Sequence, residues 1–331
     1  MVTVIAEAGV NHNGERARAE ALIAAAAEAG ADIVKFQAFS ARELVARNTK
    51  TAAYQMANTG ETDQAALLER LEFDMDDFAH LARVCRTHDV EFLCTAFDAS
   101  LLGPLIDAGM NRIKIPSGEL TNVPMLRQAG AFRLPVILST GMATIDEVEG
   151  ALSVLRQAGS GPVTVLHCTS IYPAPDETIN LRAMVSMGER FGVPVGYSDH
   201  SGGDHIAIAA VALGATMIEK HFTQDRNLPG PDHKASLEPD ELSAMVDRIR
   251  SVERCLGDGI KRPAAGEADV ARLVRRSWRA ARPLAAGSVL TADDVVLKRP
   301  CNGLAPDVDL VGRRLRQARD IDEPIRAEDL V

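Results

Sequence analysis

Two histidines stand at the ends of neighbouring apolar runs in this sequence. His200 follows the run Pro194–Asp199, and His221 lies in the run Met217–Thr223. If both runs are parallel strands of one sheet, the two imidazoles meet at one edge, where neutral imidazoles bind Mn2+, Zn2+ or Fe2+. Two protein ligands leave positions open for water and a substrate oxygen. The alternative is two unrelated, hydrogen-bonded histidines, and the spacing alone favours it.

Two lysines lie within otherwise apolar runs. Burying Lys35 and Lys114 is costly unless each ammonium group is paired with an anion. Hydroxyl side chains occupy the ends of other runs: Thr95, Ser117, Ser139 and Ser198. Together they describe a cradle for a phosphate and a carboxylate. Pairing with Glu7, Glu119 or Glu219 would instead make the lysines members of structural ion pairs, and both interpretations stay open.

Three loop features allow two interpretations each. Glu119 follows Ser117–Gly118 and could act as an acid/base, although a loop glutamate is by default solvated. Asp232 lies in a rigid Pro-Gly-Pro-Asp-His loop, where it could grip hydroxyl groups or cap the next helix. Gly202–Gly203 could bind phosphate but is more typical of a turn.

Eight short apolar runs must position these side chains. They are Val2–Gly9, Ile33–Phe39, Glu91–Phe97, Arg112–Gly118, Pro135–Gly141, Val163–Thr169, Pro194–Asp199 and Met217–Thr223. Segments of helical period separate them, such as Ala17–Ala29, which ends at Gly30, and the last is Glu238–Leu256. This alternation predicts an α/β fold, a parallel (β/α)8 TIM barrel whose working residues lie at the carboxyl ends of the strands. A doubly wound open sheet is the competitor, but no G-x-G-x-x-G follows the first run.

The rest of the chain divides around this barrel. The polar connection from Ser40 to Met75, with Tyr54 and Asn58, predicts a lid or an extra helix beside the active face. We expect a catalytic barrel over residues 1–256, a linker rich in Gly, Pro, Lys and Ala over 257–276, and a small β-rich domain over 277–331. That last domain is too short to bury much core, so we expect it to dock on another surface.

Composition narrows the classes of protein. The chain has 331 residues and a net charge of −10, and because residues 277–331 hold nine Lys/Arg and nine Asp/Glu, all of that charge falls on residues 1–276. An acidic surface argues against a nucleic-acid partner. No apolar run is long enough to span a membrane and no leader is evident. The five cysteines form no C-x-x-C pair, which favours free thiols and a cytoplasmic location.

The motifs together closely resemble the sialic acid synthase family, which makes N-acetylneuraminate, legionaminate and pseudaminate. The matching strings are Ile5–Glu7, Asn11–Gly14, Val34–Gln37, Lys114–Glu119, Leu138–Met142, His167–Cys168, Tyr172–Pro173, Tyr197–His200, Glu219–Phe222 and Gly230–Asp232. Lys298–Pro300 with Asn302–Gly303 resembles the antifreeze-like SAF domain, a β-clip fold, that ends these enzymes. Each string alone is weak, but they occur in the expected order over nearly the whole chain.

The resemblance implies a carbon–carbon bond-forming transferase that uses phosphoenolpyruvate. The acceptor it implies is N-acetylmannosamine, giving N-acetylneuraminate with release of phosphate. The alternative is 2,4-diacetamido-2,4,6-trideoxymannose, giving legionaminate, and residue types do not separate the two. More distant alternatives are a metal-dependent pyruvate aldolase and a non-enzymatic carbohydrate- or ice-binding module.

The resemblance also implies roles for individual residues. His200 and His221 would hold a divalent metal, Mn2+ before Mg2+ or Co2+, and Glu119 would be closest to proton transfer. Phosphoenolpyruvate would contact Lys35, Thr95, Lys114, Ser117, Ser139, Ser170 and Ser198, and the sugar would face Glu7, Gln37, Tyr172 and Asp232. Arg299 would reach the sugar's N-acetyl group from the partner subunit of a domain-swapped homodimer.

Two positions depart from the family pattern. Ser170 stands where some members have Asn, which can shift the phosphate contact. Cys301 replaces the usual Gly of the Arg-Pro-Gly-Asn-Gly motif, and it would strain the loop if that position needs a positive φ.

Overall fold

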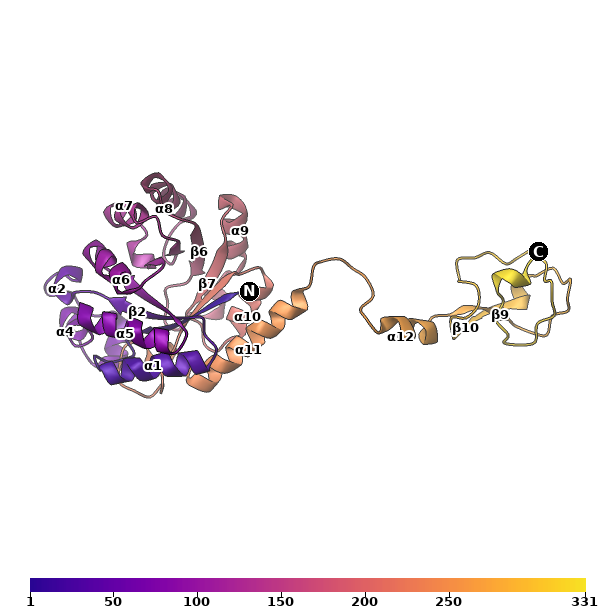
Figure 1. Cartoon of the computed structure of the whole chain (residues 1–331), viewed down its shortest axis with the longest axis horizontal. Coiled ribbons are helices and arrows are strands. Elements are labelled where there is room, and N and C mark those ends of the chain that lie inside the picture. Colours follow the sequence, from indigo (N-terminus) through magenta and orange to yellow (C-terminus); the bar gives the residue numbers. More distant parts are fainter. The chain divides into compact units, whose positions relative to one another are not determined.

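The computed structural model describes residues 1–331 and divides into two compact units, Met1–Gly257 and Asp258–Val331. In the first, eight parallel strands form a closed barrel in sequential order (Figure 1). They are β1 Thr3–Gly9, β2 Ile33–Ala38, β3 Glu91–Ala96, β4 Ile113–Ile115, β5 Val136–Ser139, β6 Val163–Cys168, β7 Val195–Asp199 and β8 Met217–His221. The predicted TIM barrel is therefore confirmed, with every strand inside or at the edge of its expected run.

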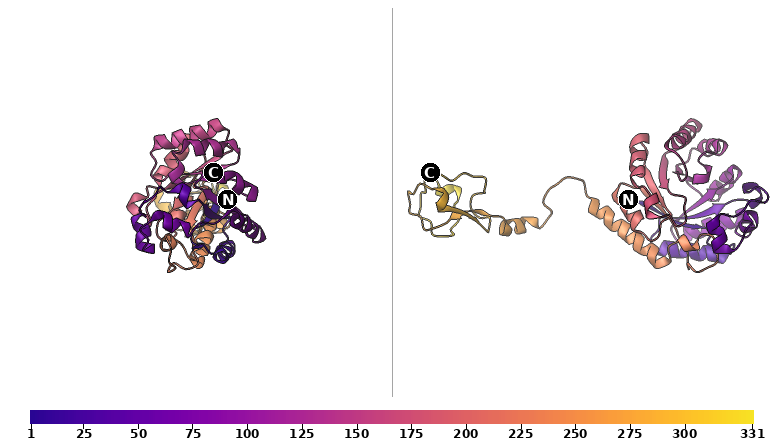
Figure 2. Two further views of the ribbon diagram at one scale, coloured as in Figure 1. Left: turned by 90° about the vertical axis from the view of Figure 1, so that its left-hand side faces the viewer. Right: turned by 180° about the vertical axis from the view of Figure 1, so that it is seen from behind.

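Helices surround the strands, as two further views show (Figure 2). They are α1 Arg16–Glu28, α5 Met75–Thr87, α6 Leu102–Ala108, α7 Val123–Ala131, α8 Ile145–Ala158, α9 Arg182–Phe191, α10 His205–Ala212 and α11 Pro239–Leu256. Gly30 has a φ of +82° two residues after α1, which explains why that helix stops there. None of the helices is both long enough and apolar enough to cross a lipid bilayer.

Strand register brings the polar strand residues to one level. Glu7 of β1 is paired with Lys35 of β2 on one side and with His221 of β8 on the other. Further round the barrel, Thr95 is paired with Lys114 and Ser198 with Glu219. The strands thus present the predicted chemical groups as a ring at their carboxyl ends, above a buried apolar core that includes Ile5, Phe36 and Leu93.

The long connection between β2 and α5 is helical, in agreement with one of the two forms predicted for it. It contains α2 Ala41–Leu44, α3 Ala53–Thr59 and α4 Gln64–Glu69. Leu67 and Leu71 pack with Val10 and Phe39 in an apolar cluster separate from the main core, with Phe97 packed against it. The connection is therefore anchored to the carboxyl ends of the strands by apolar contacts.

The second unit has its own small core. Strands β9 Ser277–Ala280 and β10 Val295–Lys298 pair antiparallel, and the core consists of Ala280, Leu284, Leu290, Leu310, Leu315, Ile325 and Leu330. The segment 257–276, expected as a linker, also contains helix α12, Glu267–Val274. The glycines and prolines of segment 257–276 all precede this helix, so only the residues up to Gly266 have the composition of a linker. Val270 and Leu273 of α12 are exposed.

Candidate active site

A cavity of about 490 Å³ opens at the carboxyl ends of the barrel strands. The predicted site residues that line it are Glu7, Lys35, Gln37, Thr95, Lys114, Ser117, Ser139, Ser170, Tyr172, Ser198, His200 and His221. Residues from every one of the eight strands or the loops that follow them contribute. The structure therefore gathers in one place the lysines, hydroxyls and histidines that are scattered over most of the barrel sequence.

The two lysines are buried at the floor of this cavity. The Lys35 Nζ lies 2.5 Å from Glu7 and 3.8 Å from Glu219, and it donates a hydrogen bond to the Thr95 hydroxyl at 2.9 Å. The Lys114 Nζ lies 3.2 Å from Glu219 and donates to the Ser139 hydroxyl at 2.6 Å. The carboxylate partners and the hydroxyl cradle, which the sequence offered as alternatives, thus coexist around the same ammonium groups.

Burial and neighbouring charges shift the pKa values of these lysines and glutamates in different directions. Burial alone would raise the pKa of Glu219, but Lys114 and Lys35 lower it to about 2. For Glu7, burial outweighs the attraction of Lys35, so its pKa is raised. Burial would lower the pKa of Lys35, but Glu219 and Glu7 raise it above the ordinary value, whereas burial lowers the pKa of Lys114. Glu219 is consequently a fixed negative charge, and Glu7 is the carboxyl group that takes up a proton more readily.

The histidines lie close together on one side of the cavity, with ring centroids 5.4 Å apart. The Nδ1 of His200 hydrogen-bonds to the Thr169 carbonyl at 2.8 Å, an arrangement that orients the ring and leaves Nε2 as a ligand atom. The Nδ1 of His221 is buried without a hydrogen-bond partner. Burial, aided by His200 and Lys35, holds the pKa of His221 well below its ordinary value.

This donor set fits a divalent metal. Two adjacent imidazoles, one oriented by a backbone carbonyl and one neutral with an orphaned nitrogen, are the arrangement that a metal ion satisfies. No group of three or more His, Cys, Asp or Glu side chains with metal-binding geometry is present, so the protein would supply two ligands and leave other positions open.

Aromatic rings from two elements close one side of the cavity. The ring of Tyr172 lies 4.1 Å from that of His200 and stacks on Tyr54 at 5.1 Å, at an interplanar angle of 21°. Tyr54 belongs to α3, so the β2–α5 connection contributes directly to the cavity wall. This contact agrees with the prediction that the connection lies beside the active face.

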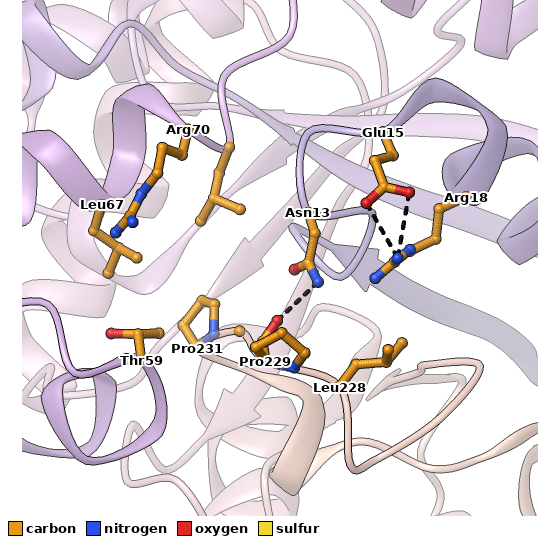
Figure 3. A pocket seen from close by; sticks show the side chains of 11 residues that line it. Asn13, Glu15, Arg18, Thr59, Leu67, Arg70, Leu228, Pro229 and Pro231 are labelled. Carbon is orange, nitrogen blue, oxygen red and sulfur yellow. Dashed lines mark hydrogen bonds and ion pairs between the residues drawn. The ribbon is translucent and has the colours of Figure 1, made fainter.

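Asp232 lines an adjoining hollow of about 250 Å³ that also touches Gln37, Tyr172 and His221. Burial, with repulsion from Glu7, raises the pKa of Asp232 to about 6. Two amides hold the loop that precedes it. Asn13 donates to the Pro229 carbonyl at 2.7 Å, as Figure 3 shows, and Asn58 of α3 donates to the Pro231 carbonyl at 2.8 Å. The loop therefore places Asp232 with support from both the segment that follows β1 and the β2–α5 connection.

Glu119 lies apart from the other predicted site residues. It does not line the cavity, and its carboxylate accepts a hydrogen bond from Asn122 at 2.6 Å instead. The turn Ser117–Glu119 directs Ser117 inward, and the Ser117 hydroxyl accepts from the Gly141 amide at 2.9 Å. Of the two, only Ser117 therefore faces the cavity.

Arg299 belongs to the second unit, in the exposed loop after β10. That loop is well held: the Pro300 carbonyl accepts from Ser277 at 2.9 Å and from Arg279 at 3.0 Å. Cys301 does not have a positive φ, so the strain considered for this position does not arise. Arg299 itself forms no hydrogen bond or ion pair within the chain.

Among the residues in or beside the cavity that were not predicted as site residues, three have clear structural roles. Glu219 bridges both lysines, Cys168 lies 3.7 Å from the Nδ1 of His200, and Gly141 leaves room for the hydroxyls of Ser117 and Ser170. A Cβ atom on Gly141 would lie 2.1 Å from the Ser170 hydroxyl. Glu219 was identified as a possible ion-pair partner, but nothing in the sequence marks Gly141 as a spacer, because the close approach arises from separate loops.

The closed barrel and this cavity define a barrel whose strand ends gather buried lysines and hydroxyl groups beside two adjacent histidines. The sequence pattern of the NeuB family matches residues 22–261 and that of the SAF domain matches residues 275–331. The chain therefore belongs to the NeuB family, as its motifs predicted. It is a carbon–carbon bond-forming transferase that uses phosphoenolpyruvate, followed by an SAF domain.

Three similar proteins span most of the chain. The N,N'-diacetyllegionaminic acid synthase of Campylobacter jejuni is 44% identical, with 91% of each chain covered. The enzyme of the same name from Legionella pneumophila is 44% identical over 94% of this chain and 90% of its own. The crystal structure of the N-acetylneuraminic acid synthetase of Leptospira borgpetersenii, in complex with citrate, has a TM-score of 0.74 and 36% identity, covering 81% of this chain and 90% of that one.

Proposed function

We propose that this chain condenses phosphoenolpyruvate with 2,4-diacetamido-2,4,6-trideoxymannose to form N,N'-diacetyllegionaminic acid. The observation that carries the choice of acceptor is the 44% identity to two synthases of that acid, against 36% to the synthetase of N-acetylneuraminic acid. N-acetylmannosamine, the first acceptor that the sequence suggested, is thus the less well supported of the two.

Phosphoenolpyruvate binds at the floor of the cavity. Its phosphate and carboxylate face Lys35 and Lys114, with Thr95, Ser139 and Ser198 as hydrogen-bonding neighbours. The network already balances two lysines with two glutamates, so an entering anion favours protonation of Glu7, whose pKa is raised. Each lysine stabilises developing negative charge by roughly 3 kcal/mol, as preorganised donors do at other oxyanion sites.

The acceptor lies between the histidines and the aromatic wall. His200 and His221 hold a divalent metal, for which Mn2+ is the expected ion, and when bound it supplies Lewis-acid polarisation of the acceptor aldehyde. Gln37, Tyr172 and Asp232 contact the sugar's hydroxyl and amide groups. The Tyr54 and Tyr172 rings exclude water from that side.

Counting σ bonds between carbon and its heavy-atom neighbours, two form and one breaks in the reaction. C3 of phosphoenolpyruvate bonds to C1 of the open-chain acceptor, and water adds to C2. The tetrahedral centre then loses phosphate by cleavage of its C–O bond. The water that adds to C2 gives one proton, by way of Glu7, to the former aldehyde oxygen, and the remaining hydroxyl proton at C2 leaves with phosphate. Glu7 is buried beside Lys35 and lines the cavity, whereas Glu119 is hydrogen-bonded to Asn122 and does not line it.

The complete site is formed by two copies of the chain. Arg299 is exposed and has no partner within its own unit, and Met142 and Ile171, at the mouth of the barrel, are also exposed. A domain-swapped dimer covers these side chains and brings Arg299 of one copy to the sugar bound by the other.

Phosphate release tests the proposed activity. With phosphoenolpyruvate and Mn2+, the protein is expected to release phosphate in the presence of the 2,4-diacetamido sugar, and more slowly or not at all with N-acetylmannosamine. A higher kcat/KM for N-acetylmannosamine would contradict the choice of acceptor. Carbon–carbon bond formation without phosphate release would favour a pyruvate aldolase.

A further inference from the structure

A side pocket adjoins the cavity on the side of the β2–α5 connection. It is the hollow of about 250 Å³ that contains Asp232. Gln37, Tyr54, Tyr172 and His221 line both this pocket and the main cavity, so the two are neighbours that share a wall. A ligand held at His221 can therefore extend into the side pocket.

The far wall of the side pocket is apolar. It is formed by Phe39, Leu44, Leu67 and Leu68, members of the apolar cluster that anchors the β2–α5 connection, and Phe97 of the same cluster lines both the pocket and the main cavity. Polar groups are confined to the near side, where Gln55 and Gln64 stand beside Asp232 and His221. No lysine or arginine lines the pocket.

The other neighbouring hollows do not continue from the histidines. One, of about 660 Å³, shares Met142, Cys168 and Ser170 with the main cavity but touches neither His200 nor His221. Another, drawn in Figure 3, is lined by Leu67, Leu71 and Pro231 among others and shares no residue with the main cavity. Only the side pocket combines contact with His221 and an unfilled volume away from the lysines.

We propose that the side pocket receives the end of the acceptor remote from its aldehyde and selects a terminal methyl group, as in a 6-deoxy sugar. This inference rests on the proposed function, because it assumes that the aldehyde lies at the histidines. A methyl group gains from contact with Leu44, Leu68 and Phe97. A hydroxymethyl group against the apolar wall loses its hydrogen bonds to water without replacing them, because the polar side chains lie on the opposite side of the pocket, and a phosphate meets Asp232 and no cation.

The test compares sugars that differ only at C6. With saturating phosphoenolpyruvate, kcat/KM is measured for 2-acetamido-2,6-dideoxymannose, N-acetylmannosamine and N-acetylmannosamine 6-phosphate. We expect the 6-deoxy sugar to exceed the 6-hydroxy sugar by about tenfold or more, and the phosphate to be turned over least. Equal values for the first two sugars would overturn the proposal and leave the proposed function intact.

Two variants assign the preference to the apolar wall. Leu68→Gln places an amide on the wall and is expected to move the ratio of the two kcat/KM values towards one, and Phe97→Tyr does so with a single added hydroxyl. The matched control is Leu213→Gln, at an exposed leucine after α10, which should keep the wild-type ratio. The ratio is measured on one preparation, so partial loss of folded protein cancels.

The outcomes separate the two proposals. An unchanged ratio in both wall variants would place the selection elsewhere and contradict the pocket's role. No phosphate release with any acetamido sugar, the 2,4-diacetamido sugar included, would contradict the proposed function itself, and the inference would fall with it.

Discussion

Gly141 tests how closely the phosphoenolpyruvate side of the cavity is packed. In Gly141→Ala the new Cβ would lie 2.1 Å from the Ser170 hydroxyl and 2.9 Å from that of Ser117, so one or both must move. Because displacements of about 1 Å in a positioned site cost up to about 100-fold, we expect kcat/KM for phosphoenolpyruvate to fall about 10- to 100-fold. Steady-state kinetics at saturating acceptor measures the change.

The matched control for this change is Gly150→Ala. Gly150 lies in α8 with nothing within 4 Å of the Cβ position, so the kinetics should stay as in the wild type. Replacing a helical glycine with alanine should also raise the free energy of unfolding by about 0.5–1 kcal/mol. Wild-type kinetics in Gly141→Ala would show that Ser117 and Ser170 do not position the substrate.

Turnover is expected to depend on a metal ion held in part by His221. Chelation should abolish turnover and added Mn2+ should restore it, since only two imidazoles hold the ion and the remaining positions exchange freely. His221→Ala should lose Mn2+ binding in a calorimetric titration while keeping its circular dichroism spectrum. His88→Ala, at an exposed histidine after α5, should bind Mn2+ normally. Full turnover by the chelated enzyme would contradict the metal site.

The types of individual residues were enough to identify much of the site. Lys35 and Lys114 stood out because lysines are rare in apolar strands, and the cavity contains both. The acid/base role of Glu119 was inferred from its place in a motif, and geometry does not favour it, because a turn sends its side chain to Asn122. Gly141 could not be identified, since its function is the space it leaves between residues distant in sequence.

Among the elements, α3 contributes Tyr54 to the wall of the cavity. Asn58 links this helix to the loop of Asp232 through the Pro231 carbonyl. Removing the amide in Asn58→Ala costs one hydrogen bond, worth about 0.5–1.5 kcal/mol, so we expect KM for the sugar to rise about 2- to 10-fold. KM for phosphoenolpyruvate should stay the same, because the floor of the cavity is built by the strands.

The control for this variant is Asn227→Ala, at an exposed asparagine whose amide bonds only to Asp225. It should leave both KM values unchanged. An equal rise in KM for both substrates in Asn58→Ala would indicate general loosening of the barrel mouth and contradict a specific link to Asp232.

The strands were predictable because short apolar runs at regular spacing allow few other folds. The helices α2, α3 and α4 were predicted only as a lid or an extra helix. They have 4, 7 and 6 residues, too few to show a helical period, and Leu44 of α2 and Leu67 of α4 are stabilised by packing in the apolar cluster. Helix α12 was missed for a similar reason, since its eight residues follow a segment rich in Gly and Pro.

The whole molecule is proposed to work as a dimer in which Arg299 acts in trans. Arg299→Ala and His200→Ala should each be inactive alone. After gentle dissociation and mixing, about half of the dimers should be mixed, and each mixed dimer should have one intact site, so activity should recover to about a quarter of the wild-type value. Phosphate release measures the recovery.

Two controls accompany the mixing experiment. Each variant taken through dissociation alone should stay inactive, and sedimentation should show that the mixture is dimeric. If Arg299 acts within its own chain, mixing restores nothing. An active Arg299→Ala enzyme would contradict a role for this residue in either arrangement.

The central claim is that this chain joins phosphoenolpyruvate to an acetamido sugar with cleavage of the C–O bond. Phosphoenolpyruvate labelled with oxygen-18 at the bridging position is incubated with the enzyme, Mn2+ and 2,4-diacetamido-2,4,6-trideoxymannose, and phosphate and sugar acid are analysed by mass spectrometry. The mechanism predicts that the label leaves with phosphate and that the nine-carbon product is formed in equal amount. Unlabelled phosphate, or phosphate without the nine-carbon acid, would contradict it.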